Sequence, residues 1–412
     1  MFGNKNLLVI LLLCSLPVYS IAQIPSQWRG ANRDGKYDGN NLLKSWPEKG
    51  PRLLWSAEEI GSGFGSAVVS GGVVYVNGEV DSISQLFAFS GEGKLLWKTS
   101  FGKEFMGNGF SAQYPGARST PTVVGELVYV SSGNGTLACI EASSGKTRWM
   151  KQMVTDLGGL RNEFGYAESP LVEGDVVYCS PGGLENNVMA LNRFTGEKIW
   201  SSKGFGDTVS FTSPMMIHLP ARNILVTSSG NYLYALDAGN GSLLWKQKQE
   251  KVQYQQQCNT PVFTDGYLYY LSGDGNGAVK LELSSDGSSY KELWRNSLAK
   301  NTFKGFVMLG NYLYAPDQTQ KLKCISTSTG QVTDSLRVKE GSLIFADGML
   351  YCYSDNGTMN LISITGSKMT ITGKFKVEKG SKEHFAHPSI YNGVLYIRHG
   401  KALMAYDIKQ AT

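Results

Sequence analysis

The sequence predicts an all-β fold made of eight copies of one four-stranded unit, and three observations support it. One string returns four times, and a second pattern that ends in a tyrosine strand precedes it. The 49 glycines and only 18% charged residues suit short strands joined by tight turns, with no long polar-striped helix. The returning string reads AFSGEGKLLW, CIEASSGKTRW, ALNRFTGEKIW and ALDAGNGSLLW at 88–97, 139–149, 190–200 and 235–245.

This string is predicted to be the last hairpin of each unit. In the copy at 235–245, Ala235 and Leu236 alternate as a strand should, and the stretch from Asp237 to Gly241 has turn chemistry. The next strand then runs to Trp245. A glycine four places before each tryptophan supplies the positive φ that the turn needs, at Gly93, Gly145, Gly196 and Gly241.

The pattern upstream of each hairpin combines a hydroxyl residue with proline, a short apolar run, a turn and a strand that carries tyrosine. Aligning that strand gives a column of Tyr75, Tyr129, Tyr178, Tyr269, Tyr314, Tyr351 and Tyr396, with Val226 in the fourth unit. A period of roughly 45–50 residues is typical of propeller blades. The sequence therefore predicts an eight-bladed β-propeller of four-stranded antiparallel blades, at 66–102, 118–154, 166–203, 211–248, 258–297, 304–338, 341–378 and 384–409.

The eighth unit has only three strands, and an N-terminal strand is predicted to complete it. The segment 51–59 carries Trp55 in the same style as the other outer strands, so it can close the ring and leave no exposed blade edge. The tryptophans of this column are interpreted as packing between blades and not as a cofactor box. The sixth and seventh units lack the tryptophan, and Leu336 and Phe375 stand near its place.

The cysteines beyond the first segment are interpreted as small core residues and not as disulfides. Cys139 and Cys324 stand where other blades have alanine, and Cys179 and Cys352 stand where others have valine. Like-positioned pairs lie four blades apart, too far for a disulfide.

The chain is expected to have three parts, at 1–22, 23–50 and 51–412. Residues 1–22 are predicted to be a signal peptide cleaved near Ala22, residues 23–50 an N-terminal extension, and residues 51–412 the propeller. An uncleaved membrane anchor is the alternative. Lipidation at Cys14 is not favoured, because Leu13 stands where a small residue is expected. We therefore expect a soluble mature chain without a transmembrane segment, periplasmic or associated with the envelope.

The formal charge of +5 is not organised as a nucleic-acid surface. No basic cluster with interleaved aromatic residues occurs, so nucleic acid is not an expected partner.

The hairpin pattern, the Ser/Thr-Pro strand starts and the eight blades resemble the pyrroloquinoline-quinone (PQQ)-type propeller repeat, over about 66–409. The strings WRGANRDG, GARSTP and GYAESP at 28–35, 116–121 and 165–170 resemble a group of exported bacterial propellers. The repeat is shared by quinoprotein dehydrogenases and by non-catalytic scaffolds, including the propeller lipoprotein of the outer-membrane β-barrel assembly machine. The resemblance implies the fold and leaves the function open.

The resemblance to quinoprotein dehydrogenases implies calcium ligands, a catalytic carboxylate and an indole beneath the quinone. Glu168 and Asn259 could imitate the ligands, but Lys304 and Gly305 stand where the base is expected. Trp28 and Trp46 precede the ring, so no indole floor is expected. No catalytic residue, metal or cofactor is therefore predicted, and PQQ with calcium belongs only to the alternative.

Two histidines, His384 and His387, lie three apart before the last blade. Because only Glu383 accompanies them, they are interpreted as part of a solvated loop and not as a metal site.

The candidate ligand site lies where the segments before each innermost strand gather at one mouth of the channel. Two of these segments are long, and their aromatic and charged residues suit a carbohydrate, a peptide strand or an acidic partner. The alternative is that they only plug the channel. The candidate residues are Phe110, Tyr114, Arg118, Arg161, Glu163, Tyr166 and Glu168, with Asn259.

The segment Trp28 to Gly35 contains Arg29, Arg33 and Asp34, which are predicted to form a salt-bridged turn that seats the N-terminus against the ring. A ligand site is the alternative.

The sequence thus predicts an exported, non-catalytic binding or scaffolding propeller of the cell envelope, with the outer-membrane protein assembly scaffold as its analogue and an envelope protein or glycan as its partner. The alternatives are a divergent PQQ-dependent alcohol or sugar dehydrogenase and a glycan-binding module. The oligomeric state is not predicted.

Overall fold

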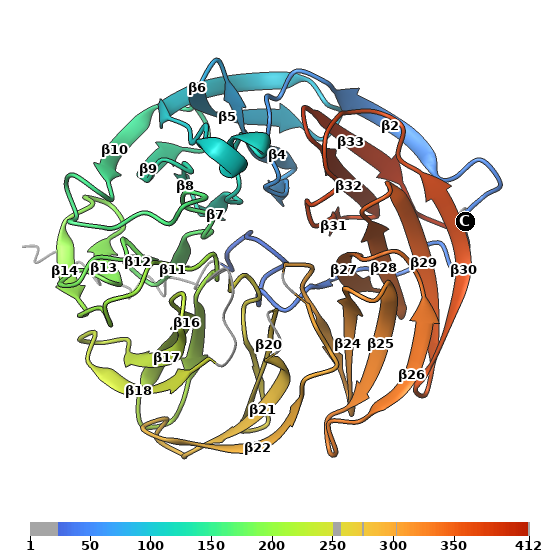
Figure 1. Ribbon diagram of the computed structural model, residues 1–412. Helices are drawn as coiled ribbons and strands as arrows, with labels where there is room; N and C mark the ends of the chain where they lie inside the picture. The colour runs from blue at the N-terminus through green and yellow to red at the C-terminus, as the bar shows by residue number, and fades with distance from the viewer. Residues whose placement is uncertain (1–23, 250–256, 274–275, 302, 411–412) are drawn as a thin grey trace, which may run out of the picture.

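The computed structural model describes residues 24–249, 257–273, 276–301 and 303–410, so the predicted signal peptide lies outside it. Eight antiparallel blades form a ring around a common centre, and we call this central region the channel (Figure 1). The predicted eight-bladed propeller is therefore confirmed. Within the described ranges the only helical element is the short 3₁₀ turn η1 (Gly109–Gln113).

Each blade runs from an innermost to an outermost strand. Blade 1 contains β3 (Val68–Ser70), β4 (Val73–Val80), β5 (Ile83–Ser90) and β6 (Leu95–Lys103). Blade 2 contains β7 (Thr122–Val124), β8 (Leu127–Ser131), β9 (Thr136–Glu141) and β10 (Thr147–Gln152). Blade 3 contains β11 (Leu171–Glu173), β12 (Val176–Cys179), β13 (Met189–Asn192) and β14 (Lys198–Ser201). Blade 4 contains β15 (Met215–His218), β16 (Asn223–Ser228), β17 (Tyr232–Asp237) and β18 (Leu243–Lys248).

The remaining blades follow the same order. Blade 5 contains β19 (Val262–Thr264), β20 (Tyr267–Ser272), β21 (Gly277–Leu283) and β22 (Tyr290–Asn296). Blade 6 contains β23 (Val307–Leu309), β24 (Tyr312–Asp317), β25 (Lys321–Ser326) and β26 (Val332–Arg337). Blade 7 contains β27 (Gly341–Ala346), β28 (Met349–Ser354), β29 (Thr358–Thr365) and β30 (Lys368–Lys376). Blade 8 contains β31 (Ser389–Tyr391), β32 (Val394–His399), β33 (Ala402–Asp407) and β2 (Arg52–Ala57).

The ring is closed by β2, which pairs antiparallel with β33 and sets Trp55 opposite Ala405. This confirms the predicted N-terminal closure. A second N-terminal strand, β1 (Lys36–Tyr37), pairs parallel with the innermost strand β27 of blade 7. Two neighbouring blades are therefore extended by residues from the start of the chain.

The tryptophan column joins each blade to the next. The indole Nε1 of Trp97 donates to the Ala142 carbonyl of blade 2 at 3.0 Å, and Trp200 donates to Ala238 of blade 4 at the same distance. The glycine of the next turn makes room for the ring, because a Cβ on Gly145 would lie 2.7 Å from the Trp97 ring. The packing interpretation is confirmed, and the turn glycine serves both backbone conformation and indole docking.

The two blades without a blade-borne tryptophan are joined differently. The cross-strand position of the tryptophan is Asp334 in blade 6 and Gly373 in blade 7, two residues before Leu336 and Phe375. The Asp334 carboxylate accepts a hydrogen bond from the Met369 backbone N–H of blade 7 at 2.9 Å.

Trp46 of the N-terminal extension packs beside Gly373 in blade 7. Its ring centroid lies 5.9 Å from Tyr351, as Trp97 lies 5.9 Å from Tyr75 in blade 1. The extension therefore supplies the indole that blade 7 lacks.

Four cysteines are buried in the blades, as predicted: Cys139, Cys179, Cys324 and Cys352. Burial raises the pKa of the Cys139 thiol to about 11 and that of Cys352 to about 12, so both stay protonated and apolar.

Candidate functional site

The N-terminal extension crosses the centre of the ring as the blue segment before β2 (Figure 1). Ser26 bridges Val123 in blade 2, and β1 pairs with β27 in blade 7. The chain between these two attachments enters the channel. We call residues 26–37 the strap.

Arg33 ties the strap to blades 3 and 4. Its guanidinium donates to the backbone carbonyls of Ser169 at 3.0 Å, Pro214 at 3.4 Å and Pro170, and to the Gln27 side chain at 2.7 Å. Desolvation lowers the pKa of Arg33 to about 9, and the nearby Glu168 opposes the shift. These carbonyls belong to the Ser-Pro segments that come just before the innermost strands, where they are available to accept hydrogen bonds from a guanidinium group.

Arg29 ties the strap to blade 6. It donates to the carbonyls of Phe306 and, at 3.3 Å, Asp34. A Cβ at Gly305 would overlap the Arg29 guanidinium, so the absence of a side chain there makes room for the strap. The strap seats the N-terminus as predicted, but the predicted arginine–aspartate salt bridge is wrong. Asp34 pairs with Lys36 at 3.1 Å, and both arginines donate to backbone carbonyls instead.

Serine and threonine at the blade starts form a hydrogen-bonded arc around the channel. The backbone N–H of Ser66 donates to Thr120 Oγ1 at 2.9 Å, that of Thr120 to Ser169 Oγ at 2.9 Å, and that of Ser169 to Ser213 Oγ at 3.0 Å. Each hydroxyl accepts the N–H of the preceding blade, which explains why hydroxyl residues precede the blade-start prolines.

On one side of the strap lies a cavity of about 840 Å³, which we call the mouth pocket. It is lined by the segments that lead into the innermost strands and by the strap itself. Its aromatic side chains are Trp28, Phe64, Phe110, Tyr114, Phe164, Phe211, Phe303 and Phe385. Its other lining residues are Arg118, Thr120, Asn162, Glu163, Ala167, Ser169, Thr208, Ser213, Cys258 and His387.

Four of the eight predicted site residues line this pocket: Phe110, Tyr114, Arg118 and Glu163. The Arg118 side chain donates to the backbone carbonyls of Gly116, at 2.9 Å, and Tyr114, so it also holds its own loop in shape. Desolvation lowers the pKa of Arg118 to about 10.

The other four lie outside the pocket lining. Arg161 donates to Asn134 and lies 5.2 Å over the Phe105 ring. Tyr166 is buried between blades 2 and 3 and donates to the Pro181 carbonyl at 2.9 Å. The Asn259 amide donates to Asn301 O at 2.8 Å and accepts from Gly305 N at 3.0 Å.

Glu168 is buried beside the strap. Burial raises the pKa of its carboxyl to about 7, and contacts with Ser180 and Arg33 offset part of that rise. Its Oε2 has no hydrogen-bond partner among the residues that the structure describes. A carboxyl in this state is close to half protonated at neutral pH.

Fourteen of the eighteen residues that line the mouth pocket were not predicted from the sequence, and Trp28 and His387 are two of them. Trp28 precedes the ring and is not expected to form an indole floor, yet the strap carries it into the pocket, where its ring meets His387 edge-on at 5.4 Å. The solvated-loop interpretation of His387 is wrong, since this side chain is 6% exposed. His384 stacks on His399 at 3.7 Å. The proline after His387 marks a blade start and could have indicated burial.

The residues present do not fit calcium-bound PQQ. In the described part of the chain no three His, Cys, Asp or Glu side chains cluster as metal ligands. Asn259 Oδ1 already accepts a backbone hydrogen bond, and Glu168 faces Arg33. The Lys304 ammonium, where a carboxylate base is expected, lies 4.5 Å from the Phe303 and Phe385 rings and pairs with Asp355.

These features define an eight-bladed propeller whose channel is crossed by its own N-terminal strap beneath an aromatic pocket. The family model described as outer membrane protein assembly factor BamB matches residues 44–203 and 92–290. The chain therefore belongs to this family of PQQ-like repeat β-propellers.

Individual relatives agree with this assignment. BamB of Yersinia pestis is 25% identical over 328 residues, which cover 75% of this chain and 75% of that protein. The structure of BamB from Moraxella catarrhalis superposes with a TM-score of 0.64 at 14% identity, over 87% of this chain and 99% of that one. A europium-containing methanol dehydrogenase superposes with a TM-score of 0.67 at 13% identity, over 91% and 90%. The two structural likenesses show the fold alone.

Within the described residues, no helix has the length and apolar character to cross a membrane.

Proposed function

We propose that this protein is an exported, non-catalytic binding or scaffolding propeller of the cell envelope, which takes part in outer-membrane protein assembly by binding a protein partner at the mouth pocket. The observation that carries the proposal is a large aromatic cavity above a channel that the strap crosses. Membership of the BamB family and the similarity to BamB of Yersinia pestis support the same role.

The mouth pocket suits apolar side chains as ligand, because several of its polar groups are already hydrogen-bonded within the protein. The hydroxyls of Thr120, Ser169 and Ser213 already accept backbone hydrogen bonds from neighbouring blades. The Asn162 amide donates to Val209 O and accepts from Phe164 N. A sugar needs directional partners for its hydroxyls, whereas a peptide with apolar side chains gains mainly from aromatic surface. A protein partner therefore fits better than a glycan.

Photo-cross-linking in the native envelope tests the proposal. Phe110 is 59% exposed in the pocket, and Phe194, in the β13–β14 turn outside it, is 49% exposed and serves as the matched control. A cross-linking amino acid at position 110 is expected to capture an outer-membrane assembly protein, identified by mass spectrometry, and one at position 194 is not. Capture of the same proteins from both positions would contradict the proposal.

Binding to the captured partner then measures the contribution of the pocket. Phe110→Ala is expected to weaken it about ten-fold or more, as buried aromatic anchors do, and Phe194→Ala to leave it unchanged. N-terminal sequencing of the protein from the envelope tests export, which predicts a mature chain that begins near Gln23. Dye-linked oxidation of alcohols or sugars after addition of PQQ and calcium would instead support the dehydrogenase alternative.

A further inference from the structure

The interface between blades 6 and 7 departs from a packing rule that most of the other interfaces follow. In each blade, one residue of the third strand pairs with the outer-strand residue that directly follows the tryptophan position. This third-strand residue faces the preceding blade. These residues are Phe87, Ala138, Met189, Tyr234, Val279, Lys323, Asn360 and Met404. Six are apolar, and Lys323 is neutralised by Asp317 at 2.5 Å. Asn360 breaks the rule in blade 7, which also has glycine in place of the blade tryptophan.

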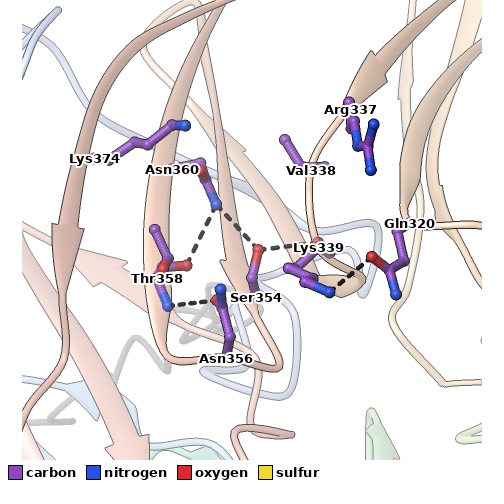
Figure 2. A pocket seen from close by; sticks show the side chains of 9 residues that line it. All are labelled: Gln320, Arg337, Val338, Lys339, Ser354, Asn356, Thr358, Asn360 and Lys374. Atoms are coloured by element: carbon purple, nitrogen blue, oxygen red, sulfur yellow. Dashed lines mark hydrogen bonds between the residues drawn. The ribbon is translucent and has the colours of Figure 1, made fainter.

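The result is a cleft between blades 6 and 7 of about 290 Å³, shown in Figure 2. We call it the 6/7 cleft. At about 30 Å³ for each water molecule, it has room for roughly ten. Its lining consists of Gln320, Arg337, Val338, Lys339, Ser354, Asn356, Thr358, Asn360 and Lys374.

The charges around the 6/7 cleft have one sign. Arg337, Lys339 and Lys374 line it, and none of the nine lining residues is acidic. Lys339 donates to Gln320 Oε1 at 2.8 Å, and none of the three cations forms an ion pair in the described part of the chain. Of the carboxylates near this segment, Asp334 pairs with Lys368 and Asp355 pairs with Lys304. Glu340, which follows Lys339 in sequence, lies near Lys304, Asp355 and Asp317 and does not line the cleft. The cleft therefore presents uncompensated positive charge.

The polar floor of the cleft is held in place by its own hydrogen bonds. Asn360 Nδ2 donates to Ser354 Oγ at 3.0 Å, and Ser354 Oγ donates to Lys339 O at 2.9 Å (Figure 2). Asn360 Nδ2 also donates to Cys352 O at 3.1 Å. This network links the turn of blade 7 to the segment that enters blade 7 from blade 6. A hydrogen-bonded polar floor between exposed cationic side chains suits an anion.

We propose that the 6/7 cleft binds a phosphate group, carried by a lipid headgroup or by a soluble phosphate compound. A guanidinium and two ammonium groups match the charge and the several acceptor oxygens of a phosphate, and the cleft leaves room for the group to which the phosphate is attached. This site is separate from the mouth pocket and does not depend on the proposed function.

Calorimetric titration with inorganic phosphate at low ionic strength tests the site. The wild-type protein is expected to bind phosphate saturably, and Arg337→Ala with Lys374→Ala is expected to weaken binding about ten-fold or more. The matched control is Lys98→Ala with Lys248→Ala: both lysines are exposed, and they occupy the equivalent registers of blades 1 and 4. This control changes the net charge equally and is expected to bind as the wild type does.

A second variant tests the cleft without altering charge. Asn360→Met replaces the polar floor with the side chain that Met189 and Met404 provide in other blades, so it is expected to weaken phosphate binding, and its melting temperature shows that the variant is folded. Sedimentation with phosphatidylcholine vesicles, with and without phosphatidic acid, separates the two sources. Binding to phosphatidic acid that the variants lose indicates a lipid headgroup, and phosphate binding alone indicates a soluble compound. Absence of saturable phosphate binding, or equal binding by all variants, would overturn the proposal.

Discussion

Replacement of Trp46 by phenylalanine should cost little stability, whereas the same change at Trp200 should cost more. The two indoles are 8% and 9% exposed, so both bury nearly the same surface. Burying a tryptophan contributes about 4–6 kcal/mol, from ~150–250 Å² at ~25 cal/mol per Å². The difference lies in Nε1: that of Trp200 donates to Ala238 O at 3.0 Å, and that of Trp46 is buried with no partner in the described structure.

A buried donor without a partner costs about 1–3 kcal/mol, and losing a made hydrogen bond costs about the same when the acceptor stays buried. Trp46→Phe therefore removes an unfavourable group together with some apolar surface, and it should lower the free energy of unfolding by less than about 1.5 kcal/mol. Trp200→Phe removes surface and leaves Ala238 O without its donor, so it should cost about 1–3 kcal/mol more than Trp46→Phe.

Urea unfolding followed by circular dichroism measures both variants, and Trp46→Ala supplies the reference. This variant should lose about 3–5 kcal/mol, because it leaves a cavity between Tyr351 and Phe375. A loss for Trp46→Phe as large as that for Trp200→Phe would refute the argument. A negligible loss for Trp46→Ala would refute the conclusion that the extension supplies the indole of blade 7.

Two further predictions concern the strap and its surroundings. The pKa of Glu168 is raised from 4.5 to about 7 in the fold, because the buried carboxyl is more favourable protonated than ionised. Its contribution to the free energy of unfolding is therefore fully present below about pH 4.5 and is lost as the pH rises through about 7. Glu168→Gln should thus be more stable than the wild type near pH 8, by up to roughly 3 kcal/mol, and should lose this advantage near pH 4.5. Urea unfolding at a series of pH values measures the difference in stability between the two proteins. A difference that stays constant with pH would contradict this prediction. Gly305→Ala, at φ +68° and against Arg29, should cost about 2–4 kcal/mol in the same assay. Gly310→Ala, at φ +54° in open space, should cost only about 1 kcal/mol, and similar losses at both positions would show that the strap does not depend on Gly305.

The blades could be read from the sequence because their signals are local and repeated. Turn glycines, the tyrosine strand and the outer tryptophan recur within one blade, and the pairing of Trp55 with Ala405 follows from completing a three-stranded unit. The pocket residues Phe110 and Glu163 were found for a similar reason, since unusually long segments before an innermost strand must meet at the mouth.

The sequence predicts that this segment seats the N-terminus against the ring, but the contacts of the strap could not be predicted, because nothing local encodes them. Arg33 binds carbonyls of blades 3 and 4, which lie more than a hundred positions along the chain, and a carbonyl has the same chemistry in every residue. Trp28 and His387 belong to opposite ends of the sequence and meet only after the ring closes. Their burial is a property of the assembled channel and not of either segment.

Positions where a blade lacks the usual residue of the repeat indicate where groups from outside that blade bind. Gly305 stands where most blades have serine or threonine, and Gly373 stands where most have tryptophan; residues of the N-terminal extension, Arg29 and Trp46, fill both spaces. Asn360 is a third departure, but no group from the described residues of this chain fills the cleft beside it. Since two of the three gaps are matched by side chains of this chain, the third is best explained by a group from outside it, and its cationic rim selects for an anion.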